Sequence, residues 1–158
     1  MKGYEGIDEV MRRLNEEVSK IEKQTLAGLI KSAILIRRSM ESTSPKVPID
    51  LGNLNASFFV VTSQSGPPVP MGGASFKGKG KGKMASEKSQ MITVLKSEIE
   101  GAPNPTLIMG FSANYAITVH ENMEGKFKRP GAGPKFFESA LARNHLNILK
   151  IIALNVKL

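Results

Sequence analysis

The chain has 158 residues, of which 41% are hydrophobic and 23% are charged, a composition typical of one folded domain with room for a long polar loop. It contains no cysteine, which excludes disulfides, thiolate metal sites and cysteine nucleophiles. The N-terminal residues carry charges where a secretory signal is apolar, and no apolar run is long enough to span a membrane, so we expect neither. A formal net charge of +8 makes nucleic acid one possible partner and says nothing about fold.

Residues 6–41 are predicted to form one long helix. Steps of three and four residues separate most of the apolar positions, which is the pattern of one helix face; these positions are Ile7, Val10, Met11, Leu14, Val18, Ile21, Leu26, Leu29, Ala33, Ile36 and Met40. Only Gly28 interrupts the pattern, at a cost of about 1 kcal/mol. Such a helix would be about 54 Å long. That exceeds what a domain this small can cover, so we expect part of it to pack against another subunit.

The middle of the chain predicts a strand, a loop and a helix. The segment Ser42–Pro45 ends the first helix, and β-branched and aromatic residues predict a strand over 54–62. Residues 63–83 are rich in Gly, Pro and Lys, which indicates a long mobile loop. Residues 84–101 are expected to form a helix that ends before Pro103.

The last third predicts the remaining strands and a final helix. Residues 106–112 are expected to form a second strand, and 115–121 a third strand or a short helix. A further Gly/Pro loop covers 122–133, and Pro134 is a normal start signal for a helix that runs to about residue 156. The predicted fold class is therefore α+β, in a single domain of residues 1–158: a long N-terminal helix, a small antiparallel sheet with a Gly/Pro/Lys loop, and a C-terminal helix.

Two segments approach catalytic motifs without matching them. Residues 73–80 follow the phosphate-loop pattern until its last position, where magnesium binding needs Ser or Thr and the chain has Gly80. The segment His120–Glu124 approaches a zinc-hydrolase helix, but Glu124 stands where the second His is required. No G-x-S-x-G serine motif is present. We therefore predict no catalytic residues, no metal site and no cofactor, and expect that the protein is not an enzyme.

Lysines alternate with glycines in the middle of the predicted loop, at Lys77, Lys79, Lys81 and Lys83. Glycine disfavours helix and strand, and the repelling lysines extend the segment. Such an arm suits contacts with nucleic-acid phosphates that are independent of sequence. Contact with solvent alone is the other interpretation, and both stay open. A second group of basic residues follows in the later loop, at Lys126, Lys128, Arg129 and Lys135.

Three segments together resemble the neck, or tail-completion, proteins of long-tailed bacteriophages. They are 48–58 (PIDLGNLNASF), 115–121 (YAITVHE) and 129–141 (RPGAGPKFFESAL). The family shows P-x-D-T-G-x-L-R-x-S before a strand, Y-A-x-x-V-E-F-G-T, and P-F-x-x-P-A-L at the last helix. Leu51 and Asn55 depart from its usual Thr and Arg, the second segment matches only with a one-residue shift, and 63–105 resembles an insertion.

The resemblance implies a structural subunit of a ring between the head and the tail, with genomic DNA passing through its channel. It further implies a homo-oligomer (a hexamer or dodecamer), contacts with neighbouring head-completion, tail-terminator or tube proteins, assembly in the bacterial cytoplasm and a place in the virion. The lysine loop is expected to face the DNA. The expected subunit-interface residues are Leu14, Val18, Tyr115, Phe136 and Phe137. A tail terminator, a minor head subunit, a separate nucleic-acid-binding module and a metal-dependent hydrolase are the alternatives.

Overall fold

The computed structural model describes residues 5–64 and 74–156. In chain order its elements are α1 (Glu5–Ser42), α2 (Asn53–Ala56), β1 (Phe58–Thr62), α3 (Lys81–Ile99), β2 (Leu107–Phe111), α4 (Ala116–Glu121) and α5 (Phe136–Asn155). The predicted α+β class, with its long N-terminal helix, small antiparallel sheet and C-terminal helix, is confirmed.

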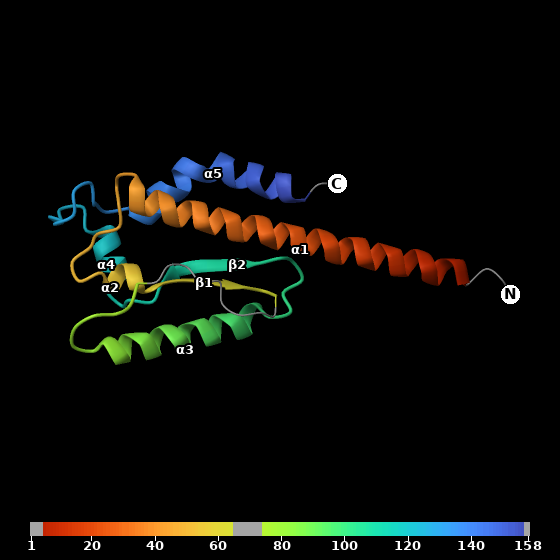
Figure 1. The fold of residues 1–158 in the computed structure, drawn as a ribbon, viewed down its shortest axis with the longest axis horizontal. Coiled ribbons are helices and arrows are strands. Elements are labelled where there is room, and N and C mark those ends of the chain that lie inside the picture. Colours follow the sequence, from red (N-terminus) through yellow and green to blue (C-terminus); the bar gives the residue numbers. More distant parts are fainter. Residues whose placement is uncertain (1–4, 65–73, 157–158) are drawn as a thin grey trace.

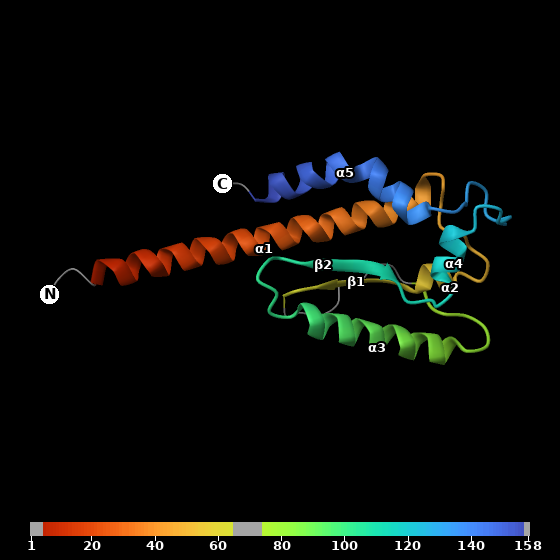
Figure 2. The same cartoon turned by 180° about the vertical axis from the view of Figure 1, so that it is seen from behind.

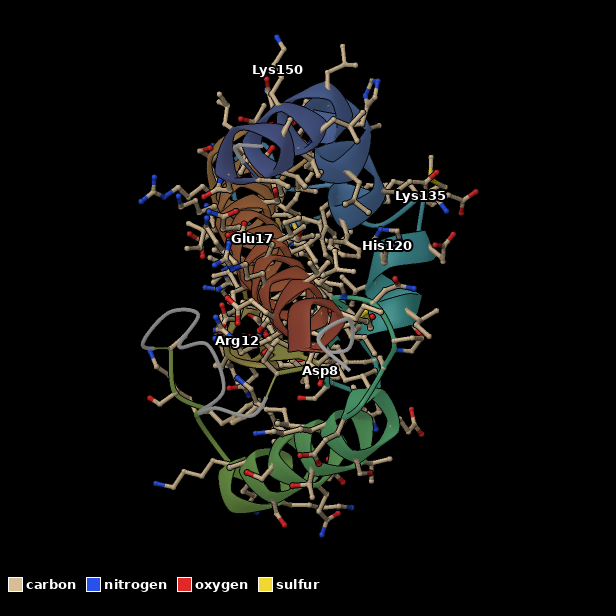
Figure 3. All side chains as sticks on the ribbon, turned by 90° about the vertical axis from the view of Figure 1, so that its right-hand side faces the viewer. Asp8, Arg12, Glu17, His120, Lys135 and Lys150 are labelled. Carbon is tan, nitrogen blue, oxygen red and sulfur yellow. The ribbon has the colours of Figure 1, made fainter. Side chains whose placement is uncertain are left out.

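The elements form layers around a two-stranded sheet. β1 pairs with β2 in antiparallel register, from Phe58 opposite Phe111 to Thr62 opposite Leu107. α1 lies over one face of the sheet, with α5 packed along α1, and α3 covers the other face (Figures 1 and 2). Viewed from the N-terminal end of α1, the order is α5, α1, sheet and α3 (Figure 3).

The alternating side chains of β1 serve both faces of the sheet. Phe58 and Val60 belong to the larger core against α1 and α5, whereas Phe59 and Val61 pack with Ile99 of α3. Because both faces are covered, the strand is a continuous apolar run, as expected for a fully buried strand. The larger core also contains Ala33, Ile36 and Met40 of α1 and Phe136 and Ala140 of α5.

Among residues 5–64 and 74–156, the other elements cover the C-terminal half of α1 and leave its N-terminal half exposed. Leu26 is the first fully buried residue of the helix, and α5 ends beside Gly28, where Lys31 reaches Asn155. The preceding turns of α1 extend beyond the other elements (Figures 1 and 2). We call residues 5–24 the free half of α1; at 1.5 Å per residue it is about 30 Å long.

One predicted strand boundary is wrong. The strand expected over 54–62 begins only at Phe58, because residues 53–56 form the single turn α2. In that turn the side-chain amide of Asn53 donates to the carbonyl of Lys77 and accepts from its backbone N–H. The side-chain oxygen of Asn55 accepts a hydrogen bond from Arg37. For 115–121, where a third strand or a short helix was expected, the structure has the short helix α4. These short helices depend on tertiary contacts that local pattern does not contain.

The predicted end of the lysine-bearing loop is also wrong. The loop expected over 63–83 ends at Gly80, and Lys81 and Lys83 lie in the first turn of α3 despite the glycine between them. Gly78 and Gly80 both have positive φ, 78° and 82°, which turns the chain into the helix. Further along α3, Lys88 donates to the carbonyl of Ala56 and attaches the helix to α2. Residues 65–73 of the predicted loop lie outside the described residues.

Candidate assembly surfaces

The three segments that resemble neck proteins meet at one end of the molecule. The backbone of Lys46 accepts from Gly133 and donates to Gly131, and Arg129 donates to the carbonyls of Glu41 and Val47. Lys135 in turn donates its backbone N–H to His120. Residues 43–57 and 112–135 thus form one structure, here called the loop end, opposite the free half of α1 (Figure 1).

A cleft of about 460 Å³ opens in the loop end. Its walls come from 48–54, Tyr115, Val119 and 126–128. Asp50 and Lys128 form an exposed ion pair of 2.6 Å at this cleft. Burial, and to a lesser degree the charge of Asp50, raises the pKa of Tyr115 above its ordinary value. The predicted interface residue Tyr115 is therefore a half-exposed, uncharged phenol at neutral pH, suited to contact with another protein surface.

His120 has a structural role at the junction of α4 and α5. Its Nε2 atom faces the backbone N–H of Glu138 at 3.5 Å, and its Nδ1 atom lies 2.8 Å from Glu121. Because the backbone N–H must donate, Nδ1 carries the proton that is shared with the carboxylate. The ring packs edge-on against Phe136 at 4.9 Å. Both ring nitrogens of the near-zinc motif are thus directed at groups of the protein itself.

The four predicted DNA-facing lysines are exposed and occupy two kinds of structure. Lys77 and Lys79 lie in the loop before α3, where Asn53 fixes the backbone of Lys77. Lys81 and Lys83 lie in the first turn of α3. Acidic residues are lacking from that turn, so the lysines face the positive end of the helix dipole, which disfavours them. An anion beside them would relieve this repulsion.

The later basic group is partly neutralised within the chain. Lys128 pairs with Asp50, and Lys135 pairs with Glu121 at 2.5 Å and with Glu138 at 3.2 Å. Hydrogen bonds from Lys135 and His120 lower the pKa of Glu121 below its usual range. Lys77, Lys79 and Lys81 have no ion pair among the described residues, so they hold more of the unbalanced charge than the later group.

The free half of α1 carries an exposed apolar stripe. It contains Ile7, Met11, Leu14 and Val18, which are 58%, 51%, 54% and 45% exposed. Steps of four, three and four residues place them on one face, and the same face continues as Leu29, which lines an apolar groove, and the core residue Ile36. The other side is stabilised within the helix by ion pairs of Glu9 with Arg12 and Arg13 and of Arg12 with Glu16. The segment is thus built as a helix that lacks a partner among the described residues.

The other predicted interface residues divide between surface and core. Phe137 is half-buried beside an apolar groove. Phe136 is only 1% exposed and packs edge-on against Phe111, so its prediction as an interface residue is wrong. Its aromatic ring was assigned to the surface because the sequence did not show which of two adjacent phenylalanines faces inward.

Arg37 is a buried arginine that no sequence motif identifies. Arg37 is 7% exposed, lies 4.6 Å above the ring of Phe58 and pairs with Glu41 at 2.9 Å. Desolvation lowers its pKa, and the opposing effect of Glu41 is smaller. The signal was present in the sequence: a charged residue stands between Ile36 and Met40 on the core-facing side of the helix. Arg37 stabilises α2 and β1 against α1 and does not face either assembly surface.

Comparisons with family models, curated proteins and solved structures found no match to this chain. Within residues 5–64 and 74–156, no cluster of three or more His, Asp or Glu side chains is placed to hold a metal ion. In the same part of the chain, no helix is long and apolar enough to cross a membrane.

Proposed function

We propose that this chain is a structural subunit of a phage neck ring, which joins the DNA-filled head to the tail and is not an enzyme. The observation that carries the proposal is the free half of α1. About 30 Å of regular helix presents a stripe of large apolar side chains to solvent. Exposed apolar surface of this extent and order is typical of a protein–protein interface.

The position of the stripe favours a ring. It lies at one end of the molecule, and the loop end lies at the other (Figure 1). A projecting helix that binds a different surface of the next copy forms a head-to-tail contact, and such contacts close into rings when the rotation allows. The proposed ring is a hexamer or dodecamer and forms part of the virion. A tail terminator or a minor head subunit would use the same kind of contact.

The loop end supports the same proposal from another direction. The first and third of the segments that resemble neck proteins are separated by the 70 residues 59–128, yet the segments form one bonded structure with a cleft. We propose that this surface contacts the neighbouring phage proteins, namely the head-completion ring or the tail terminator and tube. Tyr115, half exposed at the cleft, is the residue that we expect at such a contact.

A double substitution tests the ring proposal. Leu14→Asp with Val18→Asp places charges on the stripe but touches no core residue, so the stability of the subunit changes by less than about 1 kcal/mol. We expect the wild-type chain to form oligomers, measured by sedimentation velocity at high concentration or after addition of neighbouring neck components. The variant should stay monomeric under the same conditions, and its circular dichroism spectrum should be unchanged. Glu16→Gln, on the opposite side of α1, is the matched control and should assemble normally. Equal assembly of both variants would contradict the proposal.

Contact with DNA is a second proposed function, favoured by the lysines around the start of α3. All four lysines are exposed, and only Lys83 has an ion pair among the described residues, a weak one of 3.8 Å with Glu87. A single set of such contacts is weak, and repetition around a ring strengthens it by avidity. Duplex DNA in the channel would then be held loosely and without regard to sequence.

A further inference from the structure

α5 carries a second apolar stripe on the side that faces away from α1. Its inner face is buried in the core through Phe136 and Ala140. On the opposite side, Leu146 and Leu149 are 59% and 62% exposed, and the exposed Ala142 and Ala153 extend the row in steps of four, three and four. A helix that is apolar on both sides is typical of one covered on both sides. The described chain covers only one of them.

Basic residues border this outer stripe of α5. Lys150 and Arg143 lie along one edge and His145 along the other. Figure 3 shows Lys150 on the outer surface of α5, pointing away from α1. Arg143 already donates to the carbonyl of Ser44. Lys150 makes no ion pair within the described part of the chain, so its charge is available to a partner.

Acidic residues border the stripe of the free half of α1. Asp8 and Glu22 lie along one edge, adjacent to Ile7 and Ile21, and Glu17 lies along the other, adjacent to Val18. Two copies of this helix packed stripe to stripe would place these acids against each other, which destabilises such a pair. Arg12 and Arg13 point elsewhere and pair with Glu9 and Glu16, whereas Glu17 has an exposed ion pair of 3.3 Å with Lys20, so most of the unpaired acidic charge beside the stripe is on Asp8 and Glu22. The stripe therefore favours a partner with an apolar row and basic edges.

The two stripes also match in length. Residues 7–21 of α1 and residues 142–153 of α5 each span roughly three to four helical turns, or about 17–21 Å. Both rows have the spacing of helices that pack at a small crossing angle. Within one subunit, the inner face of α5 already packs along the same side of α1, further toward its C-terminus.

We infer that the free half of α1 binds the outer face of α5 of the next copy of this chain, with Leu14 and Val18 against Leu146 and Leu149 and the acidic edges beside Lys150. The inference rests on the proposed ring and deepens it by assigning the two surfaces that join neighbouring subunits. Each α1 is then covered by its own α5 over one half and by the neighbour's α5 over the other. The contact is head-to-tail, as ring closure requires.

A different receiving surface exists on the same molecule. An apolar groove of about 440 Å³ runs between α1, β2 and α5 and is lined by Leu29, Met109, Phe137, Leu141 and Ile148 among others. Its lining contains no charged side chain, so it offers nothing to the acidic edges of the α1 stripe. The outer face of α5 is therefore the preferred surface, and the groove is an outcome that the experiment must distinguish.

Disulfide cross-linking tests the assignment directly, because the chain contains no cysteine of its own. Two full-length variants, Leu14→Cys and Leu149→Cys, are mixed under assembling conditions and oxidised. We expect a covalent dimer on a non-reducing gel from the mixture and little from either variant alone. Leu14→Cys mixed with Leu141→Cys, which reports on the groove, should cross-link much less. Preferential linkage to Leu141→Cys, or strong linkage of either Leu14→Cys or Leu149→Cys to itself, would overturn the inference.

Charge reversal gives an independent readout. Lys150→Glu, or Glu17→Lys with Glu22→Lys, should raise the concentration needed for assembly by about fivefold, as expected for exposed charge pairs. Combining all three substitutions should restore assembly, and Lys23→Glu, away from the stripe, should leave it unchanged. If the charge reversals do not change the concentration needed for assembly, the inference is rejected but the ring proposal is not. A chain that neither self-associates nor occurs in purified virions would reject the ring proposal itself.

Discussion

At the scale of single residues, Gly28 shows why a small side chain interrupts an otherwise regular helix. A methyl group at this position would lie 2.9 Å from the Cα atom of Ile152 in α5. Backbone atoms cannot move aside as the end of a flexible side chain can. Gly28 therefore allows α1 and α5 to approach closely, and the helix tolerates its poor propensity for that reason.

Gly28→Ala is expected to destabilise the subunit. Separation of α1 from α5 costs about 1–3 kcal/mol, and the improved helix propensity offsets up to about 1 kcal/mol of this. Urea unfolding followed by circular dichroism should show a net decrease in the free energy of unfolding. Gly6→Ala is the matched control, since nothing lies within 4 Å of a methyl group there, and it should be neutral or slightly stabilising. An equal stabilisation of both variants would show that the close approach of the two helices is absent.

Glu121 gives a residue-scale prediction about pH. Its pKa is lowered, first by Lys135 and then by His120, from an ordinary value of 4.5. A carboxyl whose folded-state pKa is depressed stabilises the fold above its unfolded-state pKa, and this effect disappears as the pH falls through the folded-state value. Glu121→Gln should therefore melt below the wild type at pH 7, and the difference should vanish at acid pH. A difference that grew on acidification would contradict the role assigned to this carboxylate.

At the scale of elements, the long segments could be predicted and the short ones could not. The helices at both ends have enough turns for their apolar period to be clear, and the run Phe58–Val61 is buried on both faces. α2 and α4 have only four and six residues, and each is fixed by side chains from elsewhere. The start of α3 was missed because Gly82 suggested a loop, whereas Lys88 and Asn53 attach the surrounding segment to the fold.

The lysines at the start of α3 give a prediction at the same scale. Changing Lys77, Lys79, Lys81 and Lys83 to Ser leaves the core intact, since all four are exposed. Binding of duplex DNA by the assembled protein should weaken, and the slope of log affinity against log salt should fall by about 0.9 for each phosphate that a lysine no longer neutralises. The triple variant of Lys126, Lys128 and Lys135 to Ser is the control with a similar decrease in positive charge. Unchanged DNA affinity in the first variant would show that its lysines face solvent alone.

At the scale of the whole molecule, the chain has a compact body and a helix that extends beyond it. The sequence predicts a helix longer than its domain and a subunit interface at Leu14 and Val18, which lie on the exposed stripe. It could not show which half projects, because the apolar pattern is continuous from Ile7 to Met40. The outer face of α5 was not predicted as a contact surface, because Leu146 and Leu149 lie outside the core-facing side of the helix and single exposed leucines are common on protein surfaces.

Electron microscopy of particles from an infection by the phage that we propose encodes this chain, with Leu14→Asp and Val18→Asp introduced into its gene, tests the central claim most directly. If the free half of α1 builds the neck ring, DNA-filled heads and separate tails should accumulate, and few joined virions should form. The Lys23→Glu phage, altered on the opposite side of the helix, should give normal virions. Tailed and infective particles from the double variant, in yields equal to this control, would contradict the account.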